Sequence, residues 1–185
     1  MRHEEPVRIT RKDPALGVSK NPIHTRRNVE DLGDPYIETA QLDDHTTCRS
    51  CGQVYMSGRW YLKDEIPHNG VKVAQKNALT TCPACRKSQD HVPGGVLTLS
   101  GGFVWEHEEE IMNLIRNEAI KAQSVNALER VMSLDSSDGK MEITTTNEKL
   151  AQRIGKALHK AYDGRIDYKW SEDTKLARVK WHRDA

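Results

Sequence analysis

Four cysteines arranged as two Cys-x-x-Cys pairs are the residues of this sequence with the clearest chemistry. Cys48 and Cys51 form the first pair, and Cys82 and Cys85 form the second. Each pair can present two thiolates to one ion from a tight backbone turn, and two pairs complete a tetrahedral sulfur set for Zn²⁺. Since four thiolates leave no open position, the sequence predicts one structural zinc ion bound by all four cysteines.

Two other uses of the cysteines stay open. Disulfide bonds belong mainly to exported proteins, and the first residues of the chain lack the apolar segment of a secretory signal. Cys-Pro-Ala-Cys at 82–85 also resembles a thioredoxin-type redox site, in which a thiol has a lowered pKa. That use leaves the first pair without a role, so we favour zinc. His45, His68 and His91 flank the pairs and are expected to be surface residues.

Cations form a second candidate site on a helix predicted for residues 145–163. At 100° per residue, its four cations fall within a stripe about 60° wide, while the apolar residues lie on another face. The stripe consists of Lys149, Arg153, Lys156 and Lys160. Like charges at this spacing repel each other weakly. Two interpretations stay open, a solvated helix face and a surface that follows the phosphates of a nucleic acid.

Further cations lie in other predicted elements and extend the candidate RNA-binding set. A C-terminal β-hairpin carries Arg165, Lys169, Arg178, Lys180 and His182 on its polar side, the region of the cysteines adds Arg59, Trp60 and Arg86, and the N-terminal segment adds Arg11, Arg26 and Arg27. Cations beside aromatic rings can hold a phosphate backbone and stack on bases. Trp60 has an alternative use as a core residue of the zinc unit.

The elements that must position these residues indicate an α+β fold. We expect a disordered basic and acidic tail over residues 1–40, a zinc ribbon over 41–95, and a small α+β domain over 96–185 with a mixed sheet and two or three helices. Prolines recur in the tail without any apolar period, which is typical of disorder. A unit of ~50 residues buries too little apolar surface to fold alone, so metal binding would supply folding free energy.

Within the C-terminal region, alternation and capping signals predict the order β-α-β-α-β-β. Strands are expected at 96–99 and 141–144, helices at 106–123 and 145–163, and a hairpin of 166–170 with 177–181. Thr145 and Glu148 match a capping box, and Gly164 a helix stop. Asn126 and Glu129 indicate a short helix through Met132, and residues 135–139 a turn. In the ribbon, short strands are expected around residues 55, 59–61 and 71–73.

Composition excludes several classes of protein. The chain has 185 residues and a net charge of +1, yet residues 140–185 contain eleven basic and seven acidic side chains, so the charge is distributed in blocks. No stretch approaches the ~18 consecutive apolar residues of a membrane span, which favours a cytoplasmic protein with no membrane partner. No P-loop, HExxH or GxSxG motif occurs, so we expect that the protein is not an enzyme.

Several of these residues also resemble a known family. The segments Cys48-x-x-Cys51-Gly52, Gly58-Arg59-Trp60 and Cys82-Pro-Ala-Cys85 are similar to the zinc region of the Nmd-type adaptors, which act in large-ribosomal-subunit maturation and export. Residues 142–155, EITTTNEKLAQRIG, and 157–162, ALHKAY, resemble a short bacterial group related to that family. The resemblance spans residues 45–182. This chain is far shorter than the eukaryotic adaptor and has one cysteine quartet, so nuclear export is not carried over.

Together these features predict a non-enzymatic zinc-ribbon protein that binds the ribosome. The resemblance implies rRNA of the large subunit as the partner, with contacts to ribosomal proteins, in assembly, stress or hibernation. An alternative is a zinc-dependent interaction module that binds DNA or the transcription machinery, and a third is an enzyme with an unrecognised site. Competition between rRNA and duplex DNA for the protein would separate the first two.

Overall fold

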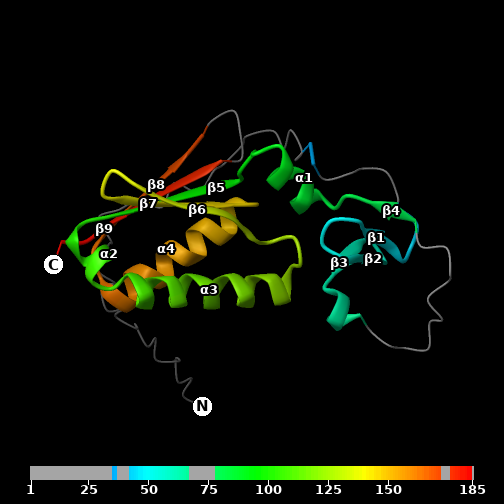
Figure 1. Ribbon diagram of the computed structural model, residues 1–185, viewed down its shortest axis with the longest axis horizontal. Helices are drawn as coiled ribbons and strands as arrows, with labels where there is room; N and C mark the ends of the chain where they lie inside the picture. The colour runs from blue at the N-terminus through cyan, green and yellow to red at the C-terminus, as the bar shows by residue number, and fades with distance from the viewer. Residues whose placement is uncertain (1–34, 37–41, 67–77, 172–175, 185) are drawn as a thin grey trace, which may run out of the picture. The chain divides into compact units, whose positions relative to one another are not determined.

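The computed structural model describes residues 35–36, 42–66, 78–171 and 176–184 (Figure 1). All of them belong to one compact unit that spans Leu32–Ala185. The expected tail, apart from residues 35–36, and the strand around residues 71–73 lie outside the described residues. Among the described residues, no helix has the length and apolar content that crossing a membrane requires.

The cysteine-bearing region forms a four-stranded sheet with the order β3-β2-β1-β4. Its strands are β1 (Thr46–Cys48), β2 (Val54–Met56), β3 (Arg59–Tyr61) and β4 (Leu79–Thr80). β2 pairs antiparallel with both β1 and β3, whereas β4 runs parallel to β1. Ser57 and Gly58, both with positive φ, form the tight β2–β3 turn, as expected for a two-residue hairpin loop. The 3₁₀ helix η1 (Lys63–Glu65) follows β3, and helix α1 (Pro83–Gln89) follows β4.

A five-stranded sheet with the order β6-β7-β5-β9-β8 forms the second part of the fold. Its strands are β5 (Gly95–Ser100), β6 (Val131–Ser137), β7 (Lys140–Thr145), β8 (Arg165–Trp170) and β9 (Ala177–His182). The central strands β5 and β9 are parallel, and the other neighbouring pairs are antiparallel. The predicted α+β class, with a mixed sheet after a four-cysteine unit, is confirmed. A domain boundary near residue 95 stays a prediction.

Three helices accompany this sheet, namely α2 (Gly102–Glu106), α3 (Glu108–Val125) and α4 (Glu148–Tyr162). Figure 1 shows α3 and α4 on the same side of the sheet, and α4 contacts β5, β7, β8 and β9. The core between the two layers consists mainly of Leu97, Leu99, Ile143, Leu150, Ala151, Ile154, Leu158, Val179 and Trp181. At Gly155, an added Cβ would lie 2.7 Å from Cγ1 of Val179, so the close approach of α4 to the sheet requires glycine there.

Three local predictions were wrong in detail. No helix follows Asn126: residues 127–128 form a turn, and strand β6 begins at Val131, which pairs with Thr145 of β7. The turn after β6 comprises only Asp138 and Gly139, both with positive φ, so residues 135–137 belong to the strand.

The N-cap of α4 is also shifted, from Thr145 to Asn147. The Asn147 Oδ1 accepts a hydrogen bond from the backbone N–H of Leu150 at 3.0 Å. Thr145 lies in β7, and its hydroxyl donates to the carbonyl oxygen of Asn147 at 2.7 Å. The ladder between β5 and β7 extends through Thr145, so strand pairing overrides the local capping pattern.

Candidate metal centre and cationic surfaces

The four cysteines lie together at one end of the four-stranded sheet. Cys48 ends β1, Cys51 lies in the turn before β2, Cys82 is the N-cap of α1, and Cys85 lies in its first turn. Local sequence explains this arrangement. Gly52 supplies the positive φ that the first turn needs, and Pro83 at the start of α1 has a φ suited to a helix N-terminus.

The cluster has the dimensions of a metal site. All four Sγ atoms lie within 4.8 Å of one another, and the Sγ atoms of Cys51 and Cys82 are 3.8 Å apart. A tetrahedral ion with metal–sulfur bonds of about 2.3 Å separates its ligands by roughly 3.8 Å. The Sγ of Cys48 also accepts the backbone N–H of Cys82 at 3.3 Å. The four cysteines can therefore hold one structural metal ion.

Burial differs among the ligands, and so does the balance between thiol and thiolate. Cys48 and Cys82 are 1% and 0% exposed, whereas Cys51 is exposed. The pKa of Cys51 is lowered to about 4, mainly by the hydrogen bond with Cys82, with smaller contributions from the backbone at Gln53 and from Arg130. The same bond and burial raise the pKa of Cys82. Without a metal ion, the exposed sulfur of Cys51 is therefore the more acidic of the two.

Arg130 is a component of the site that the sequence analysis missed. Its Nη2 donates to the Sγ of Cys51 at 3.3 Å and of Cys82 at 3.5 Å, and its Nη1 donates to the Sγ of Cys85 at 3.6 Å. The Nε donates to the carbonyl oxygen of Ala127 at 3.2 Å. The only sequence signal was its position in an otherwise acidic region, and spacing in the chain gives no indication that it meets the cysteines.

A buried apolar cluster surrounds the cysteines. It includes Trp60, Ala84 and Ala127, with Tyr55 and Leu62 packed against it. Trp60 is only 6% exposed and lies edge-on to Tyr55. Trp60 was considered both as an RNA contact and as a core residue of the zinc unit. The structure places it in the core, and its ring offers little surface for base stacking.

The two cations predicted near the cysteines each have a partner within the chain. Arg59 is exposed, donates to the carbonyl oxygen of Val125 and lies over the ring of Tyr61. Arg86 donates to the carbonyl oxygen of Tyr36 at 2.8 Å. Arg11, Arg26 and Arg27 lie outside the described residues.

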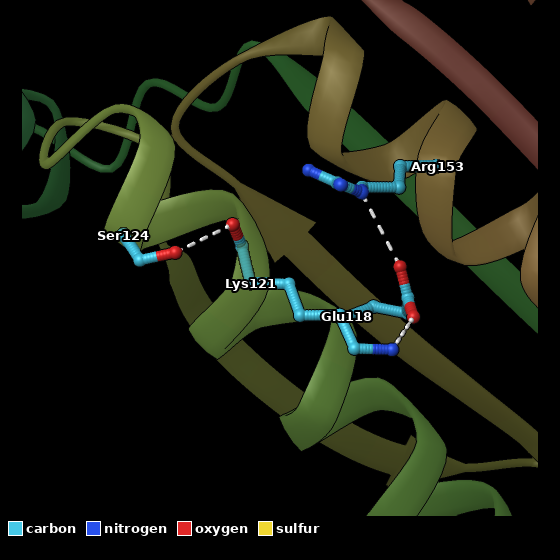
Figure 2. A network of polar contacts seen from close by, with 4 residues as sticks. All are labelled: Glu118, Lys121, Ser124 and Arg153. Carbon is cyan, nitrogen blue, oxygen red and sulfur yellow. Dashed lines mark hydrogen bonds and ion pairs between the residues drawn. The ribbon is translucent and has the colours of Figure 1, made fainter.

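All four cations of the stripe are exposed on α4, as the periodicity predicts. However, the Nε of Arg153 pairs with an oxygen of Glu118 on α3 at 3.2 Å, and Glu118 also binds Lys121 at 2.8 Å (Figure 2). The Lys121 carbonyl in turn accepts the hydroxyl of Ser124. Glu118 of α3 therefore offsets the charge of one of the four cations of the stripe.

The cations of β8 and β9 lie on the face of the sheet opposite to α4. Along β9, Ala177, Val179 and Trp181 are buried toward the helices, and Arg178, Lys180 and His182 alternate with them on the exposed side. Along β8, the exposed positions are Arg165, Asp167 and Lys169. We call the exposed residues of these two strands the cationic face. The structure thus groups the hairpin cations together and separates them from the stripe on α4.

Comparison with family models, curated proteins and solved structures found no match to this chain. The family resemblance of residues 45–182 stays an expectation from the sequence. The cysteine cluster and the cationic face are therefore interpreted from their own geometry.

Proposed function

We propose that this chain is a zinc-binding protein without enzymatic activity that binds RNA through the cationic face. Its expected partner is the ribosome in the cytoplasm, at rRNA of the large subunit. The family resemblance in the sequence supports this partner, and the charge arrangement on β8 and β9 supports RNA binding.

Zinc is the proposed metal because of the chemistry of the donors. Four thiolates at tetrahedral separation suit Zn²⁺ or an iron centre, and Zn²⁺ is the common ion of Cys₄ sites on short turns. Cys48, Cys51, Cys82 and Cys85 would hold it, and it would stabilise the small four-stranded sheet. Cys48 and Cys82 are almost completely buried, which is consistent with a structural rather than a catalytic metal ion.

The observation that carries RNA binding is a pair of like charges in register. Lys169 lies directly opposite Arg178 in the antiparallel β8–β9 ladder, and both are exposed. Like charges in this position destabilise a sheet. Asp167, whose Oδ2 lies 4.0 Å from the Nζ of Lys169, offsets part of this repulsion, and a bound phosphate would neutralise both cations. Next along the ladder, Lys180 lies opposite Asp167, the only acidic residue of the cationic face. Arg165 extends the face at the other end of β8.

The composition of this face favours structured RNA over single strands. Its side chains are Arg, Lys, Asp and His, and the aromatic residues Tyr168 and Trp170 alternate to the other side. Single-strand binding relies on aromatic rings that stack on bases, whereas RNA helices are held by contacts to phosphates and 2′-hydroxyl groups. The folded helices of rRNA meet that requirement.

Sedimentation of a cell lysate through a sucrose gradient at low salt tests the proposed partner. The protein is expected to migrate with the large subunit and to return to the top of the gradient after ribonuclease treatment. A protein that stays at the top before ribonuclease treatment would contradict ribosome binding. If duplex DNA released the protein from the ribosome as readily as free rRNA does, the DNA-binding alternative would be favoured.

A further inference from the structure

The guanidinium of Arg130 donates hydrogen bonds to several sulfurs of the cysteine cluster at once. A guanidinium has five N–H donors in a fixed planar arrangement. Arg130 directs Nη1, Nη2 and Nε to three cysteine sulfurs and one carbonyl oxygen. Of the four sulfurs, that of Cys48 accepts instead from the backbone N–H of Cys82. Each thiolate of the cluster thus has a hydrogen-bond donor nearby.

The charge of Arg130 complements the charge of a loaded centre. A divalent ion with four thiolates carries a net charge of about −2, because all four ligands bind in the deprotonated form. Arg130 is itself half-buried, and a guanidinium keeps its charge in such a setting. The contacts of Arg130 with Cys82 and Cys85 are partly buried, so the attraction between the guanidinium and these two thiolates is stronger than it would be at a surface.

The backbone of Arg130 is fixed by another element. Its N–H donates to the hydroxyl of Thr146 at 2.9 Å, and its carbonyl oxygen accepts the N–H of Thr146 at 2.9 Å. Thr146, 2% exposed, lies between β7 and α4. Lys87 of α1 also donates to the Thr146 carbonyl oxygen at 3.0 Å. Arg130 therefore connects the sulfurs to the point where the five-stranded sheet leads into α4.

From this geometry we propose that Arg130 is the positioning residue of the metal centre and that it transmits metal loading to the five-stranded sheet. The guanidinium holds Cys51, Cys82 and Cys85 in the binding geometry and offsets part of their negative charge. Metal bound to these sulfurs fixes the guanidinium, and the guanidinium in turn fixes the start of β6 against Thr146. This inference rests on the metal part of the proposed function and is independent of RNA binding.

Zinc affinity of folded variants tests the first half of the proposal. We expect Arg130→Met to weaken zinc binding by about 10–100-fold, the usual effect of losing a partner of metal ligands. Arg130→Lys keeps the charge but cannot reach three sulfurs at once, so an intermediate loss is expected. The matched control is Arg116→Met, which removes a cation on α3 that contacts Asn113 and no cysteine. Competition with a chromogenic zinc chelator gives the dissociation constants.

Hydrogen exchange tests the second half. In the wild-type chain, removing zinc should raise exchange in residues 131–145. In Arg130→Lys, which keeps the fold most closely, zinc removal should change exchange in this segment less. Unchanged zinc affinity in Arg130→Met, or an equal loss in Arg116→Met, would overturn the proposal. A wild-type chain that binds no zinc would overturn the proposed metal as well, whereas loss of RNA binding alone would affect only the RNA proposal.

Discussion

Among single residues, the four cysteines illustrate both the strength and the limit of prediction from sequence. Their spacing alone indicates a tetrathiolate site, because two Cys-x-x-Cys pairs supply the four ligands that one tetrahedral ion requires. The contribution of Arg130 could not be predicted, since it lies 79 residues from Cys51 and meets it only through tertiary packing. Trp60 had two possible uses, and only burial distinguishes them. Chemistry encoded by local spacing was predictable, and chemistry assembled by the fold was not.

Unequal exposure predicts an order of modification at the metal centre. Slow alkylation of the zinc-loaded protein with iodoacetamide should begin at Cys51, because its sulfur is exposed while Cys48 and Cys82 are buried. Peptide mass spectrometry of the first singly modified species identifies the site. A first modification at Cys48 or Cys82 would contradict the described geometry.

Among the elements, α4 and the strands it covers were well predicted, and β6 was not. α4 has a clear apolar face and β7 a clear alternation, so local sequence suffices. The edge strand β6 alternates weakly, with mostly exposed side chains over Val131–Ser137. Its strand state comes from pairing with β7, including the Asp138–Gly139 turn that sets the register. A local helix signal at Asn126 cannot compete with that pairing, because tertiary contacts override propensity.

Close packing of α4 on the sheet predicts a cost for a larger side chain at Gly155. Gly155→Val should lower the free energy of unfolding by about 1–3 kcal/mol, the usual range for overpacking. The Cβ alone would lie 2.7 Å from Cγ1 of Val179 and 3.1 Å from Cδ1 of Ile166, and the two methyl groups of valine add to this crowding. Urea denaturation of the zinc-loaded protein measures the effect. Ala161→Val, at an exposed position of the same helix, should cost under about 1 kcal/mol. Equal losses in the two variants would contradict the packing.

The N-cap of α4 predicts that an alanine substitution at Asn147 costs stability, whereas one at an ordinary exposed helix position does not. Asn147→Ala should reduce the free energy of unfolding by about 1 kcal/mol, because the N–H of Leu150 loses its acceptor. The control is Asn117→Ala, an exposed position inside α3 where alanine is the better helix former. Urea denaturation of both variants is the measurement. No loss in Asn147→Ala would mean that the cap lies elsewhere.

At the scale of the whole molecule, charge distribution carries the functional argument. The net charge of +1 gives no sign of an anionic partner. The fold places hairpin cations on one face of the sheet, while Glu118 on the helix side pairs with a cation of the stripe. Alternation in β8 and β9 predicted that their cations share a face. The sequence could not show that α4 lies on the opposite side, because that depends on sheet order.

The most direct test of RNA binding by the cationic face compares two matched charge reversals. The first variant changes Lys169, Arg178 and Lys180 to Glu, and the second changes Lys149, Lys156 and Lys160 of the stripe to Glu. Fluorescence anisotropy measures the affinity of each for an rRNA helix as a function of salt. We expect the face variant to lose most of its affinity, and the slope of log affinity against log salt concentration to fall by about one for each phosphate contact removed. The stripe variant should retain most of its affinity. A face variant that binds as well as the wild type would contradict RNA binding by the cationic face.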